Sequence, residues 1–452
     1  MRLRAIPVLL AALGSAAPAS AGAATWSPPV SVGSAATFID DPFVGFGTSG
    51  RGIVAWHWQN GIGSTAQRGT RVATRAPSGI FGPEHAAPDM RVGPVVFSTG
   101  RVAMLQEVSS FRNGQERARV QVAFGKVTGA FAPPVTIDVI NPAYAPALAS
   151  NSSGDVAVAY IQRTHGGSRR VVTLAVRHRG GPIRSPRVVM GHGRANAVTV
   201  AVGRRGDIVV AWEKEGRVEA RFQRHGHSLG PVQKVGSARK LGTQLRAAVS
   251  ADGQAWIAWR SQTLTEGGGN GPFALKLAVS HARGRGFRTP LLLDSYDRRG
   301  PEQAGFDLAL DPHGNGMIAW TTYDGTRFRA RLGVANRSGS FRSFQNLSPP
   351  GKGAIVYDLA AGRTGEALVV WDILNSVGEE PGGVRAAYIP PNGVYGGEED
   401  IGAGEKARVP AAAFNPVTGR PTVVWSERVG ADGPGVPLAE VQTFVRSATR
   451  QL

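Results

Sequence analysis

A short pattern of apolar residues repeats along the whole chain. A glycine is followed, six residues later, by an aromatic residue, and the positions between them are largely apolar. In the fourth copy Val210 and Trp212 alternate with Val209 and Ala211, so both alternating faces are apolar. This alternation predicts a β-strand that is covered on two sides. Its sheet must therefore pack between two other sheets.

The pattern occurs eight times, and successive glycines are 47 to 61 residues apart. These anchor glycines are Gly50, Gly100, Gly154, Gly206, Gly253, Gly314, Gly365 and Gly419. The second copy keeps the spacing but has Gln106 in the aromatic position. Units of this length, each with four β-like runs, are typical of propeller blades, which need neighbours to bury their faces. We expect an all-β chain that forms a single β-propeller of eight four-stranded blades.

The two ends of the chain together supply the last blade. After Trp425 the sequence offers only one more β-like run, one too few for a blade. The segment that begins at Trp26, Trp-Ser-Pro-Pro-Val, matches the Phe-Ala-Pro-Pro-Val segment that begins at Phe131 in an outer run. Residues 25–32 are therefore predicted to form the outer strand of the last blade and to close the ring. A seven-bladed ring with the second unit displaced is the alternative.

The first 23 residues have the composition of a signal peptide. Arg2 and Arg4 precede a short apolar stretch that ends in small residues. No later segment offers about 20 apolar residues in a row, so we expect no transmembrane segment. The propeller then occupies residues 24–452 of a secreted or extracytoplasmic protein. The chain has no cysteine, which excludes thiol enzymes, disulfide scaffolds and cysteine zinc sites.

The net charge favours anionic partners without identifying one. There are 51 Lys and Arg against 32 Asp and Glu, a formal charge of +19. Such a surface could attract a polyanion, but scattered arginines are also explained by composition alone. The partners we expect are an extracellular protein or a glycan, with a polyanion as a further candidate, and we expect a monomer.

The blade pattern resembles that of secreted bacterial β-propeller repeat proteins and, distantly, the sialidase-like propeller group. The resemblance implies the propeller fold over nearly all of the mature chain. The Asp-box of that group, Ser-x-Asp-x-Gly-x-Thr-Trp, is not found in this sequence. The resemblance therefore does not imply sialidase activity.

Candidate chemistry gathers where the longest loops are expected. Residues 57–69, 261–272, 294–304 and 372–383 should form loops on one face of the ring, which we expect to bind. Seven residues before the anchor glycine, three successive blades carry Arg246, Asp307 and Asp358. Two carboxylates beside an arginine could bind a sugar or a cation, act as acid and base, or form a structural ion pair between blades. The remaining ligand-binding candidates are Tyr357, Asp297 and Trp58.

The other motifs indicate neither a metal nor a cofactor. The nine histidines show no ligand spacing, and Asp311 begins a segment that reads as a turn rather than a calcium loop. The leading hypothesis is an exported, non-enzymatic propeller that binds a protein or glycan at the cell surface through its long-loop face. The alternative is a carbohydrate-active hydrolase or lyase with acidic residues at the channel mouth.

Overall fold

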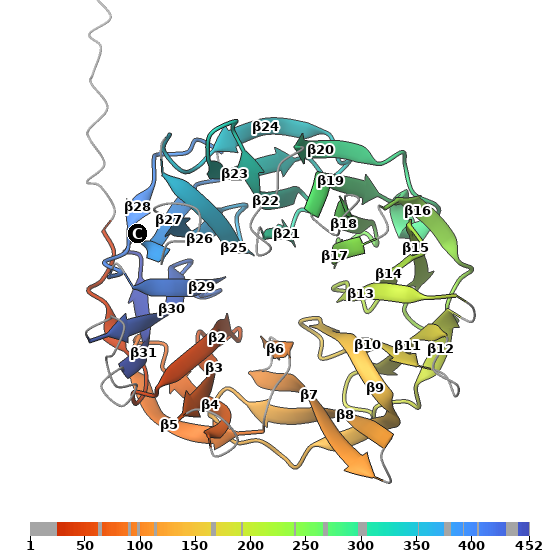
Figure 1. The fold of residues 1–452 in the computed structure, drawn as a ribbon, viewed down its shortest axis with the longest axis horizontal. Helices are drawn as coiled ribbons and strands as arrows, with labels where there is room; N and C mark the ends of the chain where they lie inside the picture. The colour runs from red at the N-terminus through yellow and green to blue at the C-terminus, as the bar shows by residue number, and fades with distance from the viewer. Residues whose placement is uncertain are drawn as a thin grey trace, which may run out of the picture.

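The computed structural model describes residues 25–61, 66–88, 92–96, 100–112, 115–163, 169–190, 193–238, 241–264, 270–296, 305–350, 352–374, 381–391, 393–404, 406–430 and 442–451. The predicted signal peptide and Asp297 lie outside these residues. The described part is nearly all β-strand, and its sheets form a ring around a central axis (Figure 1). It contains no helix long and apolar enough to cross a membrane.

Five of the blades are separate four-stranded sheets, each built from four consecutive strands. Blade 1 contains β2 (Phe38–Phe46), β3 (Gly52–Asn60), β4 (Gln67–Arg75) and β5 (Phe81–Ala87). Blade 4 contains β13 (Ala195–Val202), β14 (Ile208–Lys214), β15 (Arg217–Gln223) and β16 (Gln233–Ser237). Blade 5 contains β17 (Leu241–Val249), β18 (Ala255–Leu264), β19 (Asn270–Val279) and β20 (Leu291–Tyr296), with the 3-10 turn η2 (Ala282–Gly284) before β20. Blade 6 contains β21 (Phe306–Leu310), β22 (Gly316–Tyr323), β23 (Phe328–Ala335) and β24 (Phe341–Asn346). Blade 7 contains β25 (Gly353–Ala361), β26 (Ala367–Leu374), β27 (Pro381–Ile389) and β28 (Glu399–Asp400).

Blades 2 and 3 share one long strand and so form a single seven-stranded sheet. Its strands are β6 (Val92–Val96), β7 (Arg101–Arg112), β8 (Gln115–Lys126), β9 (Val135–Ser150), β10 (Val156–Arg163), β11 (Arg170–Arg177) and β12 (Arg187–Met190). The first part of β9 pairs with β8, and its second part pairs with β10. β9 is therefore the outermost strand of blade 2 and the innermost strand of blade 3.

The N-terminus closes the ring as predicted. Blade 8 contains β29 (Ala407–Phe414), β30 (Pro421–Val429), β31 (Gln442–Thr449) and the N-terminal β1 (Val30–Ser31). In the ladder Val30 lies opposite Ser447, and further bridges join Trp26 to Arg450 and Ala36 to Thr443. Figure 1 shows the red start of the chain beside the blue strands of its end. The described strands thus confirm eight blades and exclude the seven-bladed alternative.

The repeated glycine and aromatic residue each have a structural role. All eight anchor glycines have φ between 70° and 104°, in the left-handed region that favours glycine, at the turn between the first two strands of a blade. The anchor aromatics of blades 1 and 3 to 8 are fully buried: Trp56, Tyr160, Trp212, Trp259, Trp320, Trp371 and Trp425. Trp212, for example, packs in one cluster with residues of blades 3 and 4. The aromatic residues therefore form the core between neighbouring blades.

Candidate functional site

Three innermost strands bring Arg246, Asp307 and Asp358 to the same level. β17, β21 and β25 lie next to one another around the axis (Figure 1). In their blades, Arg246 pairs with Ala258, Asp307 with Ala319 and Asp358 with Val370. Each partner lies five residues after its anchor glycine, so the three side chains have equivalent positions. We call Arg246, Asp307 and Asp358 the axial cluster.

The axial cluster is connected from blade 5 to blade 8. Nε of Arg246 lies 3.2 Å from Oδ1 of Asp307, and the two side chains are 50% and 21% exposed. The carboxyl groups of Asp307 and Asp358 are hydrogen bonded to each other. Asp358 also accepts hydrogen bonds from the backbone N–H groups of Leu359, at 2.9 Å, and of Ala412, at 2.8 Å. A structural role between blades and a chemical role are both compatible with these contacts.

Asp358 has a raised pKa. Burial raises the pKa of Asp358 to about 7, and the charge of Asp307 and its hydrogen bond add to the shift. The backbone donors at Ala412 and Leu359 oppose it, because they favour the carboxylate. A neighbouring carboxylate makes it harder for Asp358 to ionise. Asp358 therefore keeps its proton to a higher pH than an ordinary aspartate, in contact with a second carboxyl group.

A second buried carboxyl group lies beside the cluster. Tyr357 is the extra residue of a β-bulge, because Val356 pairs with Trp371 whereas Asp358 pairs with Val370. The bulge allows Tyr357 to bond Asp372, and burial raises the pKa of both groups, that of Asp372 to about 8.

Asp372 also connects blade 7 to blade 8. It accepts a hydrogen bond at 3.2 Å from the N–H of Val409. The φ of Val409 is 52°, an unfavourable conformation for a β-branched residue, and this bond helps to hold it. The positive charge of Arg408 partly offsets the rise in the pKa of Asp372.

Sequence reasoning placed Asp372 in a loop, which is wrong. It lies within β26 and is 2% exposed. The strands before the other long loops also continue further than expected, to Asn60, Leu264 and Tyr296. A signal was present: the residue directly after the anchor aromatic is polar and buried in five consecutive blades. These residues are Glu213, Arg260, Thr321, Asp372 and Ser426. A polar side chain inside an otherwise apolar strand needs a specific partner.

The other predicted site residues do not join the axial cluster in the described structure. Trp58 is half-buried on β3, and the guanidinium of Arg71 lies 4.3 Å from the centre of its ring. Asp297 lies outside the described residues. Asp294 and Tyr296, from the same segment, belong to β20, the outermost strand of blade 5. This described part of the segment therefore lies at the outer edge of blade 5, away from the axial cluster.

A cavity lies at the opposite end of the axis. It has a volume of about 450 Å³ and is lined by turns between the first two strands of blades 3 to 8, including Asn151, Arg204, Asp311 and Asn415. Asp311 accepts hydrogen bonds from the N–H groups of His313 and Asn315, so this segment is a turn, as predicted. No residue of the axial cluster lines this cavity.

Comparisons with known proteins find distant structural similarity, with TM-scores of 0.40 to 0.44 for the three structures given below. No family model matches the chain, and no curated protein matches its sequence. A structure from a study of two prolyl endopeptidases is 13% identical with a TM-score of 0.44; the match covers 88% of this chain and 54% of that one, about half its length. NanB sialidase from Streptococcus pneumoniae is 9% identical with a TM-score of 0.40, over 92% of this chain and 68% of that one. A PL25 ulvan lyase is 10% identical with a TM-score of 0.42, over 76% of this chain and 93% of that one. These structures include a sialidase, the group that the blade pattern resembles.

Proposed function

We propose that the protein is an exported carbohydrate-active enzyme, a lyase or hydrolase, that cleaves an acidic glycan at the axial cluster. The observation that carries the proposal is the contact between the carboxyl groups of Asp307 and Asp358 beside Arg246, where burial raises the pKa of Asp358 to about 7. General acid–base catalysis is most effective when the pKa of the group is close to the working pH. The sequence favoured a binding protein because it shows no nucleophile, metal-ligand set or cofactor motif.

The separation of the carboxyl groups favours elimination over hydrolysis. The two carboxylates of a glycoside hydrolase are about 5 to 9.5 Å apart because they flank the scissile bond. Asp307 and Asp358 are in hydrogen-bond contact instead. A contacting acid and base can act on the same side of a sugar ring, as syn-elimination requires.

Each residue then has a defined role in β-elimination. Arg246, which is half exposed, binds and neutralises the carboxylate of a uronic acid and thereby acidifies the neighbouring C–H. Asp307 accepts the proton of that C–H while the bond to the leaving oxygen breaks. Asp358 donates its proton to this oxygen, and a carbon–carbon double bond remains in the sugar. Protons and electrons balance without an added oxidant or cofactor.

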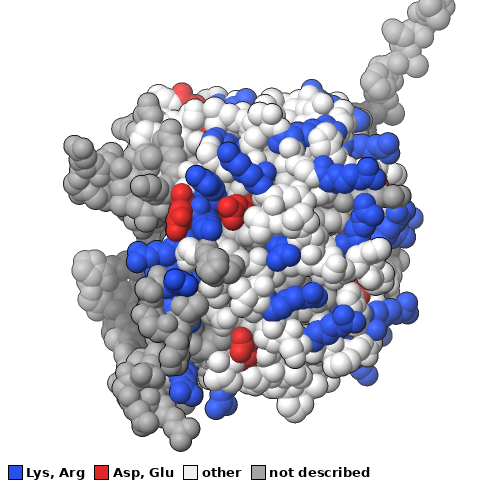
Figure 2. Space-filling model, turned by 90° about the vertical axis from the view of Figure 1, so that its right-hand side faces the viewer, with Lys and Arg blue, Asp and Glu red and all other residues white. Residues whose placement is uncertain are grey.

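The surface charge supports an anionic substrate. Figure 2 shows Lys and Arg spread over the wall of the ring, with few Asp and Glu between them. Exposed basic residues on blades 3 and 4 include Arg184, Arg187, Arg217 and Lys234. A positive surface raises the local concentration of a negatively charged polymer and increases its rate of association. Residues 1–23 support export to the compartment where such polymers occur.

The test is a polysaccharide panel incubated with residues 24–452. Elimination produces both new reducing ends and the ultraviolet absorbance of an unsaturated uronate, whereas hydrolysis produces reducing ends alone. We expect cleavage of a uronate-containing polymer, and a loss of about 100-fold or more in kcat for Asp358→Asn and Asp307→Asn. Asp400→Asn, an exposed carboxylate on the outermost strand β28, is the matched control and should keep full activity. Saturable binding of a glycan without any cleavage would overturn the proposal and return the protein to the class of binding proteins.

A further inference from the structure

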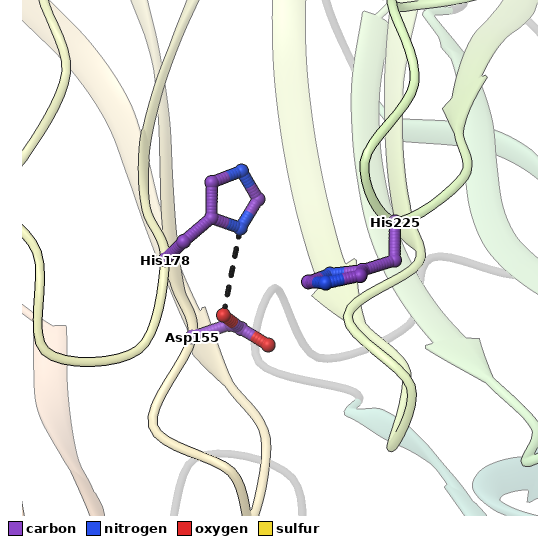
Figure 3. A group of neighbouring side chains, drawn as sticks. All are labelled: Asp155, His178 and His225. Carbon is purple, nitrogen blue, oxygen red and sulfur yellow. Dashed lines mark ion pairs between the residues drawn. The ribbon is translucent and has the colours of Figure 1, made fainter.

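Three potential metal ligands meet between blades 3 and 4, on the face opposite the long loops. Asp155 follows the turn between β9 and β10, His178 follows β11, and His225 follows β15. Figure 3 shows the two imidazole rings approaching the carboxyl group of Asp155 from different sides. One ligand atom from each residue lies within 4.8 Å of the other two. The spacing in the sequence gives no hint of this group, because its members come from three separate turns.

The carboxyl group of Asp155 is buried and fixed in place. Its Oδ1 accepts a hydrogen bond from the N–H of Arg179 at 3.0 Å, and its Oδ2 accepts one from Nδ2 of Asn151 at 2.8 Å. The side chain is 4% exposed. Each carboxylate oxygen can accept a further bond. Carboxylates that bind metal ions are typically held in orientation by hydrogen bonds of this kind from neighbouring groups.

His178 has a buried nitrogen whose hydrogen-bonding capacity is unused. Its Nδ1 lies 3.5 Å from Oδ1 of Asp155, and no hydrogen-bond partner for it is present among the described residues. Buried polar atoms are almost always bonded, and one without a protein partner indicates a water or an ion. The nitrogen points toward Asp155, so a bound ion would contact both residues (Figure 3).

Gly206 keeps the space between His225 and Asp155 open. A Cβ atom at this position would overlap Nδ1 of His225 and would lie 2.8 Å from Oδ2 of Asp155. The ring of His225 is edge-on to that of His178, with the ring centres 5.4 Å apart at 89°. Since His225 is exposed, this side of the group is open to solvent.

The turn itself does not account for the two imidazoles. Asp207 has the equivalent position in blade 4, where it accepts a hydrogen bond at 3.0 Å from the N–H of His225. Asp155 and Asp207 therefore perform the same structural task of joining two turns of their blade. Of the two, only Asp155 belongs to a described group of three potential ligands.

We propose that Asp155, His178 and His225 bind one divalent transition-metal ion of the Zn²⁺ type. Two imidazoles and one carboxylate suit Zn²⁺, Cu²⁺ or Ni²⁺, whereas Ca²⁺ and Mg²⁺ prefer a larger set of oxygen ligands. Tetrahedral zinc brings its ligand atoms to about 3.4 Å from one another, so the exposed turn of His225 closes by about 1 Å. Three protein ligands leave one position for water. The ion joins blades 3 and 4. The sequence alone led us to expect no metal, and the proposed site departs from that expectation.

The experiment is a zinc titration of the tag-free chain against a chromophoric chelator. We expect one saturable site, and Co²⁺ in its place should give visible absorption bands that report the coordination. His178→Gln and His225→Gln should each weaken zinc binding by about tenfold or more. Zinc should also raise the melting temperature of the wild type but not of the double variant.

One variant serves as the control for this titration. His227→Gln changes a neighbouring exposed histidine and should keep the wild-type affinity. Circular dichroism verifies that each variant is folded. The proposal is overturned if zinc shows no saturable binding, or if both histidine variants bind it as tightly as the wild type does.

Discussion

The strand that the N-terminus supplies to blade 8 can be removed while every other strand of the ring is kept. A chain that begins at Gly33 lacks three backbone hydrogen bonds between the termini: Ser27 to Thr449, Val32 to Val445, and Gln451 to Thr25, at 2.8 to 2.9 Å. It also lacks the buried side chain of Val32 and the bond from Nε1 of Trp26 to Glu399, at 2.8 Å. At about 1 kcal/mol for each of these four hydrogen bonds and about 2 kcal/mol for the valine, the loss amounts to about 6 kcal/mol.

The assay compares chains that begin at residue 25 and at residue 33. Thermal melting gives the overall loss, and hydrogen exchange of residues 442–451 locates it, because β31 becomes an exposed edge. Trp26→Ala is the matched variant: it keeps the backbone pairing and should lose less than half as much stability. Equal melting temperatures and unchanged exchange in β31 would refute the account of closure.

Two further predictions concern the carboxyl pair and the core. Because the pKa of Asp358 is raised, the folded chain still binds a proton that the unfolded chain releases near pH 4. The free energy of unfolding should therefore fall as the pH rises from about 4 to 7, by at most about 1.4 kcal/mol per pH unit. Asp358→Asn should flatten this slope in urea denaturation, and an unchanged slope would contradict the raised pKa. Trp371→Ala should cost about 4 kcal/mol, because its side chain is fully buried between blades 6 and 7; a loss below about 1 kcal/mol in the same assay would show that it is not core.

Much of the fold could be predicted because the repeat is local. The glycine at a positive φ and the buried aromatic six residues later have the same role in almost every blade, so counting from the glycine gives the register. Closure could be predicted because the segment at Trp26 repeats that at Phe131. The continuous strand β9 could not be predicted, because nothing in the sequence shows that the outer strand of blade 2 continues directly into the inner strand of blade 3.

Only those site residues whose positions follow from the strand register of the repeat could be predicted from the sequence. Arg246, Asp307 and Asp358 occupy one repeat position, so their meeting followed from the blade pattern. The bond between Tyr357 and Asp372 depends on a one-residue bulge, which the pattern does not encode. His178 and His225 meet through turns of different blades, and distances between blades cannot be derived from spacing along the chain.

The central claim is that burial and the contact with Asp307 raise the pKa of Asp358 to about 7. Carbon-13 NMR of chains labelled at the aspartate carboxyl carbons measures it directly, with Asp358→Asn to assign the signal. We predict that Asp358 titrates near pH 7, and that Asp307→Asn lowers its pKa by removing the neighbouring charge. A carboxyl signal for Asp358 that titrates near pH 4, and that does not respond to Asp307→Asn, would contradict the account.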